Sequence, residues 1–473
     1  MYSLLFLGFA SFVLSLILTP LVRNLALRFG LVDLPDEYRK SHKVPVPRVG
    51  GIAILAATVG AYALLLLVGL SAGHIVRHGL PFAIRLLPAV AVIFGVGLAD
   101  DIFDLSAWIK LGAQIAAAML AWEGGIRLDT ISGHSFSGAL SFVLTILWVV
   151  ACSNALNLID GVDGLAAGVG LFAIITTLIA GLLHGNMDLV FATAPLAGAL
   201  LGFLRFNFNP ASIFLGDCGS LTLGFLLGCY GIVWSEKSPT LLGMTAPLLA
   251  LSVPLLDAGI SIGRRFLRQQ PIFRGDRSHI HHKLLSRGLT PRRVVLLLYG
   301  FCGLAAAASL MITATHQKYQ GFVIVLVCLA AWLGLQHLGY NEFAVAGRLA
   351  VDGSFRRLLN AQFVLIGFEE ELASAATLQQ CWEILCKACP QFGFIGSKLR
   401  LDGIECSGSP TGGWYVRIEF PGHGYINLMR KPGSADHGSS SVLFIDSITR
   451  ILTQRLNQLT SNDSEALAYE NAD

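Results

Sequence analysis

Charged residues are scarce in this sequence. They make up 13% of the 473 residues, whereas soluble domains carry about 25%. Hydrophobic residues make up 54% of the chain, so we expect an integral membrane protein. The formal net charge is only +3, and the composition therefore gives no sign of a surface that binds nucleic acid.

A cleavable signal, a disulfide framework and a zinc site are not evident either. The first apolar run, residues 3–22, is long enough to span a membrane and lacks a basic segment and a small-residue cleavage site. Most of the nine cysteines lie in apolar runs or near the carboxyl terminus, where disulfides are not expected. Cys386 and Cys389 form a CxxC pair without a second pair at zinc spacing, so we interpret them as structural.

Long apolar runs are abundant. Runs of about 16 to 22 apolar residues predict membrane spans, and eleven such runs occur, at 3–22, 51–70, 83–99, 108–122, 138–153, 165–183, 188–204, 213–233, 244–262, 294–314 and 319–338. The fourth and fifth runs are short. Residues 1–338 are therefore predicted to form an all-α polytopic membrane domain with about eleven transmembrane helices.

The basic residues of the loops predict the orientation of these spans. Lys and Arg concentrate in residues 23–50 and 263–293, which follow odd-numbered spans. By the positive-inside rule these loops face the cytosol. The polar clusters of the chain all follow odd-numbered spans too, so we expect one cytosolic site.

The region after the last span predicts a separate domain. Residues 339–360 are interpreted as a linker, 361–460 as a small cytosolic α+β domain, and 461–473 as a disordered tail. Alternating patterns predict strands at 398–401, 414–420 and 425–429, and a closing helix is expected at 443–459. The order resembles a GAF-type sensory module and suggests regulation through an unknown cytosolic ligand or partner.

The most informative polar stretch is Asn154–Gly168, NALNLIDGVDGLAAG. An ionised Asp near the bilayer centre costs about 2.5 to 3.5 kcal/mol on insertion scales. Asp160 and Asp163 are therefore expected to face a loop, a polar cavity or a cation. At helical spacing, Asn157, Asp160 and Gly164 would share one face.

Other carboxylates suggest a hard cation. Adjacent Asp100 and Asp101 repel each other unless a divalent ion or a lysine lies nearby, and Lys110 follows nine residues after Asp101. Asp217 begins another apolar run. Carboxylate and amide oxygens without a thiolate set favour Mg²⁺, with Mn²⁺ as the alternative.

Basic clusters suggest an anionic substrate. His279, His281 and His282 lie between Arg277 and Lys283, a setting that suits a phosphate better than a metal, although solvated loop histidines remain an alternative.

A second basic cluster lies in the first cytosolic loop. Lys43 and Arg48 precede Gly50 and Gly51, which predicts a phosphate cradle or an ordinary positive-inside loop. Cations, a hard metal and carboxylates at one membrane face together favour phosphoryl transfer between a cytosolic nucleotide and a lipid phosphate.

Five motifs carry a resemblance to a known family. In order they are HKxPxPRxGG, DDxxD with its following lysine, NALNLIDGVDGLAAG, FNFNPASIFLGD and RSHIHHKLL. Over about residues 1–340 the chain resembles the polyprenyl-phosphate N-acetylhexosamine-1-phosphate transferases. The HIHH form resembles the branch that uses UDP-GlcNAc for O-antigen, enterobacterial common antigen or teichoic-acid linkage, rather than the phospho-MurNAc-pentapeptide branch.

This resemblance implies a reaction. GlcNAc-1-phosphate would pass from UDP-GlcNAc to undecaprenyl phosphate, releasing UMP and needing Mg²⁺, as the first membrane step of a cell-envelope polysaccharide pathway. The enzyme would lie in the bacterial inner membrane. Alternatives are another donor, UDP-GalNAc or UDP-MurNAc-pentapeptide, or a transporter or receptor with a regulatory tail. The oligomeric state, including a homodimer, stays open.

The resemblance also implies residue roles. Asp217 would be the main Mg²⁺ ligand, with Asn157 assisting. Asp100 and Asp101 would lie at the lipid-phosphate end, one of them as a base or orienting group, and Lys110 would contact phosphates. The expected substrate-binding residues are Lys43, Arg48, Asn154, Asp160, Asp163, Arg277, His279, His281 and His282. One-step displacement is favoured over a covalent aspartyl intermediate, because a lipid phosphate is already largely dianionic at pH 7.

Overall fold

The structure is a computed structural model, and it divides into two compact units, Met1–Tyr340 and Asn341–Asp473. We call them the helical unit and the carboxyl-terminal unit. The described residues are 2–33, 45–68, 72–131, 134–236, 251–267, 279–314, 354–375, 377–401, 404–408, 414–421, 424–430 and 441–454, with a few helical residues between 321 and 337.

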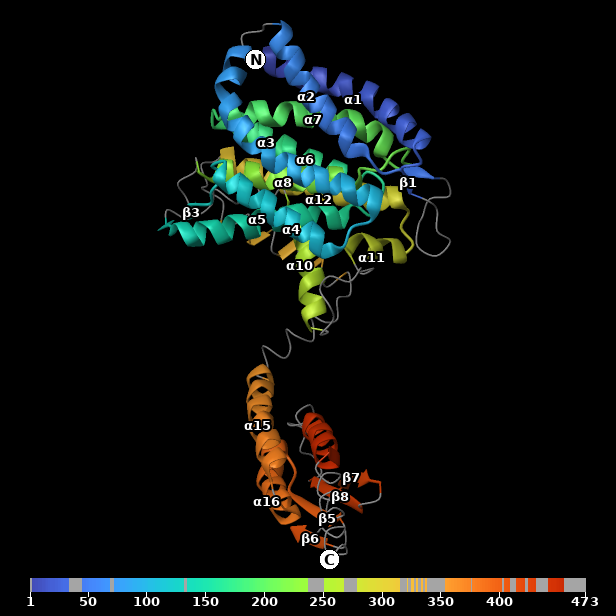
Figure 1. Cartoon of the computed structure of the whole chain (residues 1–473), viewed down its shortest axis with the longest axis vertical. Coiled ribbons are helices and arrows are strands. Elements are labelled where there is room, and N and C mark those ends of the chain that lie inside the picture. Colours follow the sequence, from blue (N-terminus) through green and yellow to red (C-terminus); the bar gives the residue numbers. More distant parts are fainter. Residues whose placement is uncertain are drawn as a thin grey trace, which may run out of the picture. The chain divides into compact units, whose positions relative to one another are not determined.

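The helical unit consists almost entirely of helices (Figure 1). Their bounds are α1 Tyr2–Arg28, α2 Gly50–Val68, α3 Ala72–Phe103, α4 Ala107–Glu123, α5 Gly138–Ile159, α6 Leu165–Leu183, α7 Met187–Asn207, α8 Gly216–Glu236, α10 Ser252–Leu267, α11 Ile280–Ser286 and α12 Pro291–Ala314. Two short antiparallel pairs join β1 Val32–Asp33 to β2 Val46–Pro47, and β3 Thr130–Ile131 to β4 His134–Ser135.

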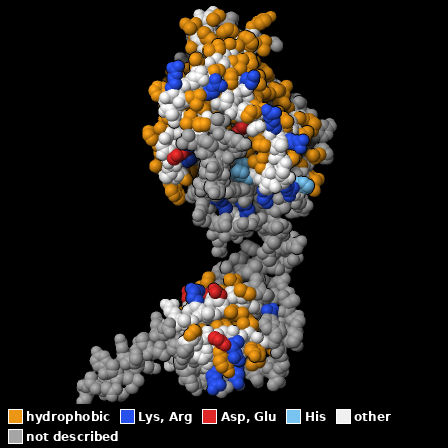
Figure 2. Space-filling view, turned by 90° about the vertical axis from the view of Figure 1, so that its right-hand side faces the viewer, with side chains coloured by type: hydrophobic (Ala, Val, Ile, Leu, Met, Phe, Trp, Pro, Cys, Tyr) orange, Lys and Arg blue, Asp and Glu red, His pale blue; other side chains and the backbone are white. Residues whose placement is uncertain are grey.

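Eight of the described helices are long and apolar enough to cross a membrane: α1, α2, α3, α5, α6, α7, α8 and α12. Large apolar side chains such as Phe9, Leu67 and Leu304 are 68%, 82% and 70% exposed. Figure 2 shows hydrophobic side chains over much of the described surface of this unit. Lipid is the environment in which such a surface is stable, so the unit is a multi-pass membrane domain.

The predicted number of eleven spans is not confirmed. α4 covers the predicted span 108–122 but has only 17 residues and is not among the eight. α10 begins at Ser252, eight residues later than the predicted span at 244. Most of the predicted span 319–338 lies outside the described residues.

Helices α6 and α8 form the centre of the helical unit. In the membrane-crossing stretch of α6, 72% of the residues are buried, and in that of α8 78% are buried. The corresponding share in α1 is 28%. Glycines allow α2 and α3 to approach the first turn of α8. A Cβ on Gly51 would lie 2.4 Å from the backbone N of Gly219, and one on Gly97 would lie 2.6 Å from the backbone O of Asp217. The start of α8 is therefore held by backbone contact with two helices.

Two turns decide how the polar residues are presented. Between α3 and α4 the chain reverses through Asp104, whose φ of 49° is left-handed, and Lys110 thereby returns toward the end of α3. α5 ends at Ile159, and α6 starts after Gly164, whose φ is +79°. The prediction that Asn157, Asp160 and Gly164 share one helix face is therefore wrong, because the helix ends before Asp160.

The carboxyl-terminal unit combines helices with an antiparallel sheet in the order β6-β5-β8-β7. The elements are α15 Ser354–Ser374, α16 Leu378–Ala388, the 3-10 helix η1 Cys389–Phe392, β5 Gly396–Leu401, β6 Ile404–Gly408, β7 Trp414–Phe420 and β8 Gly424–Arg430, followed by a helix at 441–454. Each predicted strand falls on an observed one, but β6 was not predicted. α15 begins inside the predicted linker 339–360.

The core of this unit is aromatic and aliphatic. Phe392 stacks on Phe444 with 4.3 Å between ring centroids, and Ile426 and Leu428 of β8 are buried against the same cluster. The closing helix therefore covers one face of the sheet.

Candidate active site

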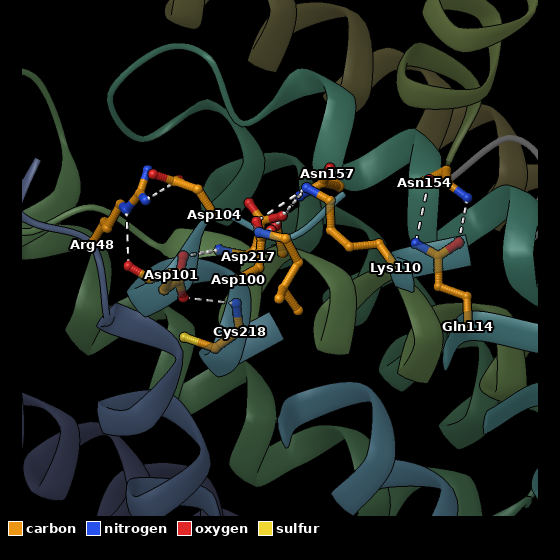
Figure 3. A network of polar contacts seen from close by, with 12 residues as sticks. Arg48, Asp100, Asp101, Asp104, Lys110, Gln114, Asn154, Asn157, Asp217 and Cys218 are labelled. Atoms are coloured by element: carbon orange, nitrogen blue, oxygen red, sulfur yellow. Dashed lines mark hydrogen bonds and ion pairs between the residues drawn. The ribbon is translucent and has the colours of Figure 1, made fainter. Parts of the chain in front are cut away.

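Lys110 joins two carboxylates from different helices. Its Nζ lies 3.0 Å from Oδ2 of Asp100 on α3 and 3.0 Å from Oδ2 of Asp217 on α8 (Figure 3). Because Asp100 also accepts the backbone N–H of Leu105 at 2.8 Å, the turn between α3 and α4 is tied to the same group. An ammonium between two carboxylates offsets the repulsion that would otherwise separate them.

Asp101 faces the start of α8 rather than Lys110. Its Oδ1 accepts the N–H of Asp217 at 2.8 Å, and its Oδ2 accepts the N–H of Cys218 at 3.0 Å. The first N–H groups of a helix have no partner within it, so this carboxylate satisfies two of them. Gly216 is required beside it, since φ is +76° and a Cβ would lie 2.7 Å from Asp101 Oδ2.

Arg48 ties the loop before α2 to the end of α3. Its Nε donates to the backbone O of Asp101 at 3.2 Å and its Nη2 to Asp104 Oδ1 at 2.5 Å. Burial alone would lower the pKa of Arg48, but Asp104, Asp101 and Asp33 outweigh it and the pKa is raised. The guanidinium is therefore a fixed positive charge at the edge of the site.

The two amide side chains of α5, Asn154 and Asn157, have different partners. Asn157 donates to Ser220 Oγ at 3.0 Å and lies beside the Asp217 carboxylate. Asn154 forms a reciprocal amide pair with Gln114 of α4, with N···O distances of 2.5 and 3.3 Å. Asn154 therefore joins α5 to the helix that carries Lys110, a structural role that we did not predict.

Asp160 and Asp163, which we expected to face a loop, a polar cavity or a cation, have different surroundings. Asp163 Oδ2 accepts from Asn209 Nδ2 at 2.9 Å and from the backbone N of Ala211 at 3.0 Å, which ties the 160–164 turn to the loop before α8. Burial, with smaller contributions from Asp217, Asp101 and Asp163, raises the pKa of Asp160 well above its usual range. A nearby cation would favour its ionised form.

The three histidines form a stack. The rings of His279 and His281 are nearly parallel at 3° with centroids 5.7 Å apart, whereas His282 is tilted by 44° against His281 with centroids 4.3 Å apart, and we call the three rings together the histidine stack. Neither ring nitrogen of His281 has a hydrogen-bond partner among the described residues. A Cβ on Gly161 would lie 2.9 Å from His281 Nε2, so the stack adjoins the 160–164 turn.

Burial, with smaller contributions from His282 and His279, lowers the pKa of His281 to about 4, although Asp257 acts in the opposite direction. His281 is therefore a neutral ring at pH 7. Sequence reasoning missed Asp257, the buried partner of His279, because it lies inside an apolar run and belongs to no polar cluster. Lys43 and Arg277 lie outside the described residues.

The carboxylate and amide oxygens around Lys110 are candidate ligands for a metal ion. Within the described part of the chain, no group of three or more His, Cys, Asp or Glu side chains is arranged to hold a metal ion. Asp217 and Asp100 nevertheless offer two carboxylates around one ammonium, with the Asn157 amide beside Asp217. Because Mg²⁺ usually takes one or two carboxylates plus substrate phosphates, these residues fit a metal whose coordination the substrate completes.

The fold and the site together define a multi-pass membrane protein with a histidine stack and an acidic centre, by which we mean Asp100, Asp101, Lys110 and Asp217. Residues 83–235 match the model of glycosyl transferase family 4. These residues include the whole acidic centre, from Asp100 to Asp217.

Curated relatives extend this match. The chain is 36% identical over 294 residues to a probable undecaprenyl-phosphate N-acetylglucosaminyl 1-phosphate transferase of Bacillus subtilis, covering 61% of this chain and 79% of the relative. It is 37% identical over 335 residues to the decaprenyl-phosphate N-acetylglucosaminephosphotransferase of Mycobacterium tuberculosis, covering 63% and 80%. It is 28% identical over 327 residues to the undecaprenyl-phosphate alpha-N-acetylglucosaminyl 1-phosphate transferase of Escherichia coli, covering 66% and 84%. The chain belongs to this family of polyprenyl-phosphate N-acetylhexosamine-1-phosphate transferases.

Proposed function

We propose that the protein transfers GlcNAc-1-phosphate from UDP-GlcNAc to undecaprenyl phosphate, giving undecaprenyl-diphosphate-GlcNAc and UMP. The reaction takes place at the cytosolic face of a bacterial inner membrane and begins a cell-envelope polysaccharide. The names of the relatives support a polyprenyl phosphate acceptor and an N-acetylglucosamine phosphate donor. The observation that carries the proposal is the Asp100–Lys110–Asp217 cluster at the end of α3 and the start of α8.

The chemistry is a single displacement at phosphorus. An oxygen of the lipid phosphate attacks the phosphorus next to GlcNAc, a new P–O bond forms, and the bond from this phosphorus to the oxygen of UMP breaks. The attacking phosphate, with a second pKa near 6, is largely dianionic at pH 7 and needs no general base. Catalysis then consists of positioning and charge neutralisation.

The residues divide these tasks. Asp217 with Asn157 would hold Mg²⁺, which when bound offsets the charge of the phosphates. Lys110 orients a phosphate and keeps Asp100 and Asp217 together. Asp101 holds the backbone from which Asp217 projects.

The histidine stack lies beside the 160–164 turn, where we place the pyrophosphate of the donor. Lys43 and Arg277 would add positive charge to the donor site, as the sequence motifs imply, and Arg48 would add it at the end of α3. The carboxyl-terminal unit is proposed to act in regulation, through a cytosolic ligand or partner of unknown class.

The test is UMP release by the purified protein with undecaprenyl phosphate and Mg²⁺, using UDP-GlcNAc, UDP-GalNAc and UDP-MurNAc-pentapeptide in parallel. We expect turnover with UDP-GlcNAc alone, and loss of this turnover in Asp217→Asn. Asp129→Asn is the matched control, because Asp129 is a carboxylate bonded to Ser141 Oγ outside the cluster. Turnover with another donor would refute the proposed donor, and silence with all three would refute the transferase proposal.

A further inference from the structure

One buried carboxylate of the helical unit has no place in the chemistry described so far. Asp257 lies on α10 and is 2% exposed. Its Oδ2 lies 3.1 Å from Nδ1 of His279, and its Oδ1 accepts the backbone N–H of Ile280 at 2.8 Å. Both oxygens of one side chain are therefore used by two adjacent residues at the start of α11.

This contact determines which ring nitrogen of His279 carries a proton. An ionised carboxylate can only accept hydrogen bonds, so Nδ1 must be the donor. Nε2 is then the ring nitrogen that is left for a ligand, and its position depends on the ring plane that Asp257 fixes. His279 itself is only 5% exposed, so its ring has little room to turn away from this carboxylate.

The effect extends beyond one ring. His279 is stacked on His281 at an angle of 3°, and Ile280, whose backbone the same carboxylate holds, lies between them in the chain. His281 in turn meets the 160–164 turn at Gly161. Asp257 therefore contributes to the orientation of the whole histidine stack beside this turn.

We propose that Asp257 is a positioning residue, which sets the tautomer and ring plane of His279 and so aligns the histidine stack with the pyrophosphate of the sugar-nucleotide donor. The inference rests on the proposed function for the identity of that ligand. The tautomer itself depends only on the contact between Asp257 and His279.

The variants are Asp257→Asn and Asp257→Glu, and Asp129→Asn, the same substitution at an exposed carboxylate, is the control. In Asp257→Asn the amide NH₂ can donate to Nδ1, which moves the ring proton to Nε2. We expect kcat/KM for UDP-GlcNAc to fall roughly 10- to 100-fold, as for carboxylates that orient metal-bound histidines, and KM for undecaprenyl phosphate to change less than twofold. Asp257→Glu keeps an acceptor and should recover part of the loss.

A second measurement follows the tautomer directly. The ¹⁵N NMR signals of His279, assigned by their loss in His279→Gln, should show a protonated Nδ1 in the wild type and an exchanged pattern in Asp257→Asn. Adding Asp257→Asn to the His279→Gln variant should cause no further loss of activity.

The outcomes separate the two proposals. If the wild type releases no UMP from any donor, the proposed function fails while the NMR signals still test the tautomer. If Asp257→Asn keeps the wild-type kcat/KM, raises KM for both substrates equally while lowering the thermal midpoint, or adds its full loss to His279→Gln, the positioning role is overturned.

Discussion

The carboxylate of Asp101 holds the backbone of Asp217, 116 residues later in the chain. It accepts the N–H of Asp217 at 2.8 Å and that of Cys218 at 3.0 Å. The adjacent Asp100 instead faces Lys110, since neighbouring residues on a helix point in directions about 100° apart. Two adjacent acidic residues thus have different tasks, one in the ionic cluster and one in fixing the helix that carries Asp217.

This contact predicts the effect of Asp101→Asn. The amide keeps one acceptor oxygen, but its NH₂ group faces a backbone N–H, which it cannot accept. One hydrogen bond to a charged group is lost, which lowers the free energy of unfolding by about 1.5 to 3 kcal/mol. We expect a fall in kcat of roughly 10- to 100-fold and a lower thermal midpoint, measured by UMP release and by thermal unfolding in detergent. Asp129→Asn should change kcat less than twofold, and equal effects of the two variants would contradict the anchoring role of Asp101.

Lys110→Met removes the only ammonium described between Asp100 and Asp217. The two carboxylates then repel each other unless another cation neutralises them. We expect UMP release to fall at least about 100-fold, with the thermal midpoint lowered in EDTA and raised by Mg²⁺ more strongly than in the wild type. Lys110→Arg, which keeps the charge, should retain the wild-type response of the midpoint. A midpoint of Lys110→Met that does not respond to Mg²⁺ would argue against a shared cation site.

The fold was predictable where the signal was local. Apolar runs predicted α6 at its observed bounds, Leu165–Leu183, because a span must satisfy its backbone polar groups within the helix. The end of α5 was not predictable from residue spacing. The sequence pattern of polar and small residues is compatible with a helix that continues through Asp160, but the chain turns there. The strand β6 was also missed, since IECSG has little alternation and is stabilised by pairing with β5.

The site was predictable as a set of residues but not as a set of contacts. The sequence indicated Asp100, Lys110 and Asp217, and the structure brings them together. We did not predict a role for Gln114 or Asp257, because their partners lie far away in the sequence. A polar residue inside an apolar run was the available signal, because burying one is costly unless it is bonded.

Close packing at the start of α8 predicts a glycine requirement. A Cβ on Gly51 would lie 2.4 Å from the backbone N of Gly219, which cannot move as a side chain could. Gly51→Ala should therefore push α2 from α8, lower the thermal midpoint by several degrees and reduce UMP release. Gly95→Ala is the control, since nothing lies within 4 Å of its Cβ. Equal midpoints for the two variants would show that α2 and α8 do not touch there.

The buried ring of His281 predicts a dependence of stability on pH. Its pKa is about 4 in the folded protein, below the ordinary value of 6.5. Above pH 6.5 the ring is neutral in both states, and its environment contributes fully to stability. As the pH falls from 6.5 to 4 the unfolded chain binds a proton that the folded chain does not, so stability is lost over this window, by at most about 3 kcal/mol.

His281→Gln stays uncharged at every pH and isolates this effect from the other titrating groups. We expect the difference in free energy of unfolding between wild type and His281→Gln to be constant above pH 6.5. Below that pH the wild type should lose stability relative to the variant, as measured by denaturant unfolding in detergent between pH 4 and 8. Parallel curves across the whole range would mean that the ring is solvated or paired, and that its neutral state is not imposed by burial.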